Sequence, residues 1–272
     1  MAALDVTILG CGSSPGVPRI GNDWGSCDPT NPKNKRSRAS LLVERRAGPD
    51  KVTRVLIDTG PDMREQMIAA NVDWVDAVLY THPHADHIHG IDDLRAFVLN
   101  RKQRVKVYMD ADTAERVQAA FEYCFVSPHN SNYPPILDDH RIHVGETLTI
   151  DGDGGPITAQ IFRQLHGSIH SLGFRFGSFA YSTDLHELPE ESHDAVRGLD
   201  TWIIGALRET PHPSHLSVDQ AIALSEQMGA RRTILTHMHN TLDYETLKAR
   251  LPEGFEPGYD GMTFQVEGAD EL

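Results

Sequence analysis

The chain is 272 residues long and carries a formal net charge of -14, with an isoelectric point near 5.4. A long nucleic acid is a poor partner for such a chain, because a polyanion would be repelled, whereas a small anionic substrate remains possible. Three widely spaced cysteines and an N-terminus without a signal-peptide pattern or an apolar run of membrane length lead us to expect a cytoplasmic protein without membrane contact.

The N-terminal part of the chain is predicted to be rich in strands, with alternating or β-branched apolar runs at residues 4–9, 40–44, 54–57 and 77–80. A helix is expected from Pro61, because Met63, Met67 and Ala70 recur at helical spacing. Further helices are predicted at residues 92–100 and 113–125, on either side of a strand at 105–109. Residues 127–139 contain three prolines and show no periodicity, so we expect a long loop there.

The second half repeats this order of strands followed by helices. Strands are predicted at residues 157–164, 172–176, 179–182, 201–204, 233–235 and 262–266, and helices at 218–228 and 244–251. Because the strands do not alternate regularly with helices, two packed sheets with helices outside fit better than a doubly wound sheet. The predicted fold class is α/β, a four-layer αββα sandwich, formed by a single domain over residues 1–272.

The strongest chemical signal is an HxHxDH pattern that directly follows the apolar run at residues 77–80. It places four possible metal ligands close together: His82, His84, Asp86 and His87. Imidazole and carboxylate groups suit zinc or manganese, and iron is possible. The alternative is a solvated loop that happens to be rich in histidine. The position just past a strand end, where side chains converge, favours a metal site.

With this pattern the sequence resembles the metallo-β-lactamase superfamily over essentially its whole length. The resemblance implies a distant histidine, aspartate and histidine at strand ends, matched here by His166, Asp184 and His237. It further implies two divalent metal ions, one on His82, His84 and His166 and the other on Asp86, His87 and His237, with Asp184 bridging them. Such a pair of ions generates a bridging hydroxide that attacks the substrate. Asp58 matches the family's DTG turn, where it would support a ligand histidine, or it is an ordinary turn aspartate.

The opening segment LGCGSSPGVP is similar to the start of two branches of this superfamily: the tRNA 3′-processing endonucleases and the PhnP-like cyclic-phosphate phosphodiesterases. In both branches a histidine at the place of His215 faces the substrate phosphate, which implies a general acid or an electrostatic clamp. The alternative is a helix-capping region in which Ser217 has the structural role. No basic, glycine- and proline-rich arm is present, so the small-molecule branch is favoured. Of that branch's cysteine cluster only Cys27 remains, and we expect no additional zinc on Cys27 and His239.

These observations lead us to expect a metal-dependent hydrolase of a small anionic phosphodiester or nucleotide, such as a cyclic nucleotide or cyclic ribose phosphate. Asp86, Asp184 and His215 are the predicted catalytic residues. One alternative is a thioesterase or lactonase with the same metal site, and another is a metal-dependent nucleotide-binding protein without turnover. The family resemblance makes a homodimer possible.

Overall fold

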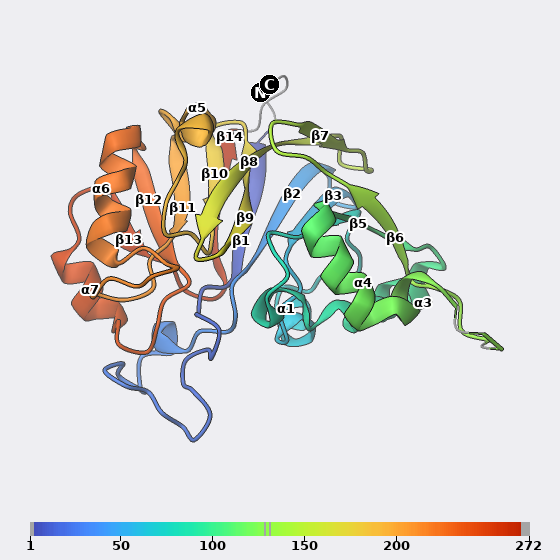
Figure 1. The fold of residues 1–272 in the computed structure, drawn as a ribbon, viewed down its shortest axis with the longest axis horizontal. Helices are drawn as coiled ribbons and strands as arrows, with labels where there is room; N and C mark the ends of the chain where they lie inside the picture. The colour runs from blue at the N-terminus through green and yellow to red at the C-terminus, as the bar shows by residue number, and fades with distance from the viewer. Residues whose placement is uncertain (1–2, 128, 131, 268–272) are drawn as a thin grey trace.

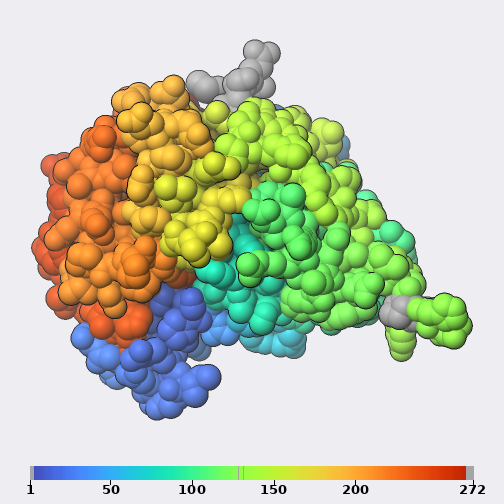
Figure 2. Space-filling model, in the orientation of Figure 1, coloured from blue at the N-terminus to red at the C-terminus, as the bar shows by residue number. Residues whose placement is uncertain are grey.

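The computed structural model describes residues 3–127, 129, 130 and 132–267. Two sheets face each other and helices cover their outer sides, so that four layers lie side by side in Figure 1. The predicted αββα sandwich is therefore confirmed. An N-terminal segment, blue in Figure 2, projects at the lower edge of the view beneath the orange and red C-terminal half. Within the described residues, no helix combines the length and the apolar character that a membrane crossing requires.

The first sheet is formed mainly by the N-terminal half of the chain. Its pairing is antiparallel from β14 to β3 and parallel from β3 to β6. Parallel neighbours require a crossover connection, and helices of the outer layer supply it. In spatial order its strands are β14 (Met262–Glu267), β1 (Ala3–Gly10), β2 (Ser40–Gly48), β3 (Lys51–Ile57), β4 (Ala77–Leu79), β5 (Val105–Met109) and β6 (Leu137–Arg141).

The second sheet is formed by the C-terminal half in a similar way. Its pairing is antiparallel from β7 to β10 and parallel from β10 to β13. In spatial order its strands are β13 (Phe255–Pro257), β12 (Arg232–Thr236), β11 (Thr201–Gly205), β10 (Phe179–Ser182), β9 (Ile169–Phe176), β8 (Ile157–His166) and β7 (Thr147–Ile150). Each sheet thus has a parallel part, and the loops after parallel strands leave from one edge.

The helices lie outside the sheets, as Figure 1 shows. The first sheet carries α1 (Met63–Ala69), α2 (Ala85–Ile88), α3 (Arg95–Arg101) and α4 (Ala111–Phe125), and the second carries α5 (His193–Val196), α6 (Val218–Met228) and α7 (Tyr244–Arg250). Short 3-10 helices are η1 (Pro32–Asn34), η2 (Ile91–Leu94) and η3 (Glu190–Ser192). Ser217 begins α6 through a reciprocal capping box with Gln220, the role that the alternative interpretation of this region gave it.

The central strands of the first sheet are buried on both faces. In β3, Leu56 packs in the cluster beneath the outer helices, while its neighbour Ile57 packs in the core between the two sheets. Val78 and Leu79 of β4 divide in the same way, because successive side chains of a strand point to opposite faces. Because these strands are buried on both faces, their sequences are continuous runs of apolar residues.

Three edge strands depart from the prediction. The last residues of the expected loop at 127–139 belong to β6, whose sequence LDDHR is mostly polar, and residues 128 and 131 of that loop lie outside the described residues. The strands β7 and β13 were not predicted, being short edge strands, and β13 contains a proline. The helix expected at 92–100 begins as the 3-10 turn η2 and continues as α3.

Candidate metal centre

The predicted ligands converge where the two sheets meet, at the ends of strands and at the start of one helix. His82 and His84 follow β4, and Asp86 and His87 lie in α2, which begins directly after them. From the second sheet, His166 ends β8, Asp184 follows β10 and His237 follows β12. Both halves of the chain therefore contribute to one site.

Their donor atoms form two groups that could each hold a metal ion. In each group the ring nitrogens and carboxylate oxygens lie within 4.8 Å of one another. One group contains His82, His84, His166 and Asp184, and the other contains Asp86, His87, Asp184 and His237. Asp184 is common to both groups. The structure thus brings together all seven residues that the sequence resemblance implied.

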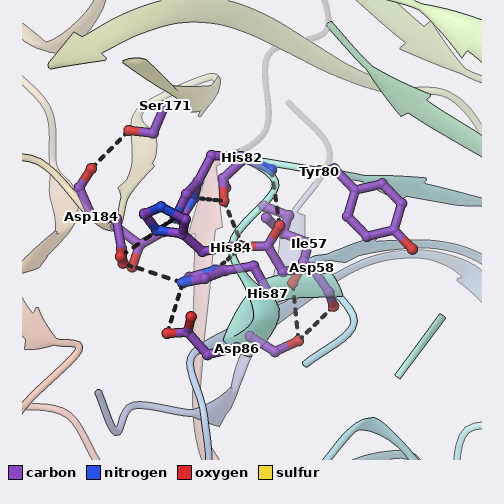
Figure 3. Close-up of polar contacts among 12 residues, drawn as sticks. Ile57, Asp58, Tyr80, His82, His84, Asp86, His87, Ser171 and Asp184 are labelled. Atoms are coloured by element: carbon purple, nitrogen blue, oxygen red, sulfur yellow. Dashed lines mark hydrogen bonds and ion pairs between the residues drawn. The ribbon is translucent and has the colours of Figure 1, made fainter. Parts of the chain in front are cut away.

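Three aspartate or histidine residues of the site have left-handed backbone conformations. Asp58, Asp184 and His237 have φ angles of 63°, 42° and 57°. Residues other than glycine adopt this region uncommonly, and such strain concentrates at functional sites. At Asp184 the turn is held by the Ser171 hydroxyl, which donates to the Asp184 backbone carbonyl at 2.8 Å (Figure 3). The left-handed turns place the side chains of Asp184 and His237 in the site, and that of Asp58 behind it, directly after a strand ends.

Asp58 orients two histidines from behind, as Figure 3 shows. Its Oδ2 atom accepts a hydrogen bond from His87 Nδ1 at 2.7 Å and another from the Thr81 hydroxyl at 2.8 Å. The Thr81 oxygen lies 2.9 Å from His82 Nδ1 and accepts from it, because its own proton points to Asp58. Both imidazoles therefore carry the proton on Nδ1 and direct the lone pair of Nε2 into the site.

The donor set fits divalent cations. His87 Nε2 is buried, lies 3.3 Å from Asp86 Oδ2 and 3.4 Å from Asp184 Oδ1, and forms no hydrogen bond within the described residues. A buried ring nitrogen that faces two carboxylate oxygens is stabilised by a metal cation between them or, in the metal-free protein, by a proton on the nitrogen. Burial opposes a charged imidazole, but Asp184, Asp86 and Asp58 raise the pKa of His87 well above its usual value. The site therefore carries excess negative charge that a bound cation would neutralise.

Asp184 and His82 have the protonation states that metal ligands need. Burial alone would raise the pKa of Asp184, yet the neighbouring His237 and His87 hold it well below the usual value. Burial, reinforced by nearby His87, lowers the pKa of His82 well below its usual value. Asp184 is thus an anion and His82 is neutral near pH 7. Both can donate a lone pair without first losing a proton.

His215 lies at the side of the site, between ligands of both groups. Its ring stacks on His237 with 4.9 Å between centroids and meets the ring of His166 edge-on at 4.7 Å. The loop that carries it is fixed to the site because His166 Nδ1 donates to the Ser214 carbonyl at 2.7 Å. Burial lowers the pKa of His215 to about 3, so the ring is neutral near pH 7 and can donate one N–H. A role as acid requires a bound anion that restores a positive charge to it.

Cys27 and His239 belong to neither group of possible ligands in the described part of the chain. The Cys27 thiol donates to the Asn240 and Leu242 carbonyls at 3.4 Å, and the buried Arg36 guanidinium binds the His239 and Leu242 carbonyls. Hydrogen bonds therefore hold this corner of the chain together.

Sequence reasoning missed several residues that touch the candidate ligands, among them Ser14, Thr81 and Ser214. Thr81 stood beside the motif and offered a signal. The contacts of the Ser214 carbonyl and of the Ser14 hydroxyl could not be predicted from the spacing of residues along the chain.

A cavity of about 790 Å³ adjoins the site. Its wall includes Pro83, between two of the predicted ligands, and Gly167, next to a third. The opposite wall is the start of α4 and contains Asp110, whose Oδ2 atom lies 2.5 Å from His170 Nε2. Sequence spacing had not singled out His170. A substrate held at the metal centre would have room for its remaining part in this cavity.

Fold and site define a protein of the metallo-β-lactamase fold with a candidate metal centre. A family model described as "Beta-lactamase superfamily domain" matches residues 53–238. The chain belongs to this superfamily.

Two curated relatives and one solved structure place the chain within the superfamily. The chain is 33% identical over 260 residues to an octanoyltransferase of Porphyromonas gingivalis, covering 94% of this chain and 50% of that protein. It is 27% identical over 180 residues to a ribonuclease Z of Aeropyrum pernix, covering 64% of this chain and 50% of that protein. The chain thus spans about half the length of these curated relatives. A crystal structure titled as a new diphosphatase from the PhnP family superposes with a TM-score of 0.87 at 34% identity, covering 98% of each chain. The predicted PhnP-like relationship is confirmed.

Proposed function

We propose that the chain, acting as one hydrolase domain, cleaves a small phosphodiester, such as a cyclic nucleotide or cyclic ribose phosphate. The observation that carries this proposal is the pair of ligand groups that share Asp184. The similarity to a diphosphatase covers 98% of both chains, and the similarity to a ribonuclease Z covers about half of that ribonuclease. Both similarities support a reaction in which a bond to phosphorus is cleaved.

Different residues of the site would have different roles in the reaction. When bound, two divalent ions supply an activated water near neutral pH and neutralise charge on the phosphoryl oxygens. Asp184 sets the spacing of the two positions because it belongs to both groups. Asp58 holds His87 directly and His82 through Thr81, so that each presents Nε2 to the site.

His215 is the proposed donor to the phosphoryl group or to the leaving oxygen. It is neutral in the unliganded protein because burial lowers its pKa to about 3. An anionic phosphoryl group beside the ring would favour the charged form, and His215 would then protonate the leaving oxygen or stabilise charge on the phosphoryl oxygens. The edge-on contact with His166 and the stacking on His237 fix the ring beside both ligand groups.

The adjoining cavity supports a substrate of limited size and charge. Arg116 and Arg163 line it together with Asp110, Asp112 and Glu115, so that its charge is mixed. Such a wall suits a polar group rich in hydroxyls, such as a nucleoside sugar, better than a second strongly anionic group. The volume of about 790 Å³ is in the range of pockets for single small ligands.

Two relatives favour specific alternatives to a phosphodiester. The diphosphatase similarity favours cleavage of a phosphoric anhydride at the same centre. The relative named octanoyltransferase favours attack on an acyl carbonyl, as in a thioesterase, but this chain covers only half of that protein. We place the phosphorus reactions first because the diphosphatase likeness extends over essentially both chains.

The proposal is tested by assaying zinc- or manganese-loaded protein on bis-p-nitrophenyl phosphate and on 2′,3′- and 3′,5′-cyclic nucleotides. Nucleoside diphosphate sugars and an acyl thioester complete the panel. We expect turnover of at least one phosphodiester that is lost in Asp184→Ala and His82→Ala. Turnover of the anhydrides or the thioester alone would favour the corresponding alternative. Phosphodiester rates no higher than those of the two variants would refute the proposal.

A further inference from the structure

The glycine-rich loop after β1 touches the metal centre through the side chain of Ser14. The Ser14 hydroxyl donates a hydrogen bond of 2.7 Å to Asp86 Oδ2. Ser14 is exposed and Asp86 is buried, so the hydrogen bond links the buried carboxylate to a residue at the surface. The two residues are 72 positions apart in the chain, and no motif connects them.

The hydrogen bond reaches an oxygen atom that points into one ligand group and not the other. Asp86 Oδ2 lies 3.3 Å from His87 Nε2 and 3.4 Å from His237 Nε2. Asp86 is absent from the group that contains His82, His84 and His166. An effect of Ser14 on metal binding should therefore be confined to the position formed by Asp86, His87, Asp184 and His237.

The loop is placed firmly enough to hold the carboxylate. The Ser13 amide donates to the Met238 carbonyl at 3.1 Å, next to His237 in the chain, and the Gly16 amide donates to the Ser13 carbonyl at 2.7 Å. Gly12 packs so closely that a Cβ atom there would lie 2.8 Å from two backbone carbonyl oxygens. The loop thus connects Asp86, which lies beside the first sheet, with His237, which follows β12 of the second sheet.

We propose that Ser14 is a positioning residue that selectively strengthens metal binding at the Asp86–His87–Asp184–His237 position. Without this hydroxyl, Asp86 Oδ2 would still lie beside His87 and His237 but would lose the donor that fixes its direction. The carboxylate would then sample other rotamers, and the metal position would lose one preorganised ligand. Loss of such an outer partner typically weakens metal affinity 10- to 100-fold. The inference rests on the proposed function only through the metal centre and not through any substrate.

The test is a titration of the metal-free protein with Co²⁺, followed by calorimetry and by the visible absorption of the bound ion. In Ser14→Ala we expect one site to keep its affinity and the other to weaken by about 10- to 100-fold. Ser14→Thr should restore the affinity because it retains the hydroxyl. Ser13→Ala is the matched control, because the buried Ser13 hydroxyl has no hydrogen-bond partner within the described residues.

Single-site backgrounds identify the affected position. With His84→Ala, which disables the other group, the remaining Co²⁺ site should respond to Ser14→Ala. With His237→Ala the remaining site should not respond. Equal weakening in both backgrounds, unchanged affinity in both, or failure of Ser14→Thr to rescue would overturn the proposal. These titrations contain no substrate, so a failure of the phosphodiester assay leaves their outcome unaffected.

Discussion

Asp58→Asn should weaken metal binding although Asp58 is itself no predicted ligand. The substitution preserves the shape of the side chain but removes its charge and converts one acceptor oxygen into a donor group. Oδ2 accepts from His87 Nδ1 and from the Thr81 hydroxyl, and Oδ1 accepts from the Thr81 amide. An amide with one oxygen cannot accept all three hydrogen bonds. The tautomer of His87 that presents a free Nε2 is then no longer favoured.

The magnitude follows from the bond that is lost. A hydrogen bond to a charged group contributes about 1.5–3 kcal/mol. At about 1.4 kcal/mol per factor of ten, losing the His87 contact should weaken metal binding roughly 10- to 150-fold. The assay is competition for Zn²⁺ against a chromophoric chelator at pH 7.

The matched control is Asp76→Asn. Asp76 also accepts a backbone hydrogen bond, from the Arg54 amide at 2.8 Å, but it lies just before β4, at the end away from His82 and His84. We expect Asp76→Asn to lower the unfolding temperature and to leave Zn²⁺ affinity unchanged. Zn²⁺ affinity of Asp58→Asn within threefold of the wild type would refute the role assigned to Asp58.

Three further predictions concern chemistry, metal removal and pH. His215→Asn should lower kcat on bis-p-nitrophenyl phosphate by about 10²- to 10⁴-fold with unchanged Zn²⁺ affinity, and a parallel loss of affinity would contradict a role in the reaction. Removing metal with a chelator should lower the unfolding temperature, because an ion present at 100 times its Kd stabilises the native state by about 2.7 kcal/mol. An unchanged unfolding temperature would argue against metal binding by the native state. Burial raises the pKa of Asp260 from its usual value to about 6, so its contribution to stability is complete below about pH 4 and is lost as the pH rises to about 6. The unfolding free energy of the wild type should therefore fall by roughly 1–3 kcal/mol relative to Asp260→Asn over this range in denaturant titrations, and a constant difference would contradict the assignment.

The central strands and the ligands were predictable from the sequence because both depend on local order. Strands β3 and β4 are buried on two faces and therefore read as uninterrupted apolar runs, and the HxHxDH pattern starts where β4 ends. The remote ligands His166, Asp184 and His237 were found only through resemblance to a family, since each is a single residue at a strand end.

The remaining features depend on contacts that the sequence does not display. Strand β6 is polar because it lies at a sheet edge, so it resembles a loop. The contact between Ser14 and Asp86 requires the glycine-rich loop to dock across the sheet boundary. Neutral His215 depends on its burial among other imidazoles, which spacing along the chain cannot reveal.

We propose that one cluster of histidines and aspartates would hold two divalent metal ions, with Asp184 common to both ligand groups. This proposal is tested most directly by a crystal structure of the zinc-loaded protein with anomalous diffraction measured at the zinc edge. The account predicts two anomalous peaks, one within each ligand group, with a carboxylate oxygen of Asp184 coordinating each ion. A single peak, or peaks that lie away from these seven side chains, would contradict it.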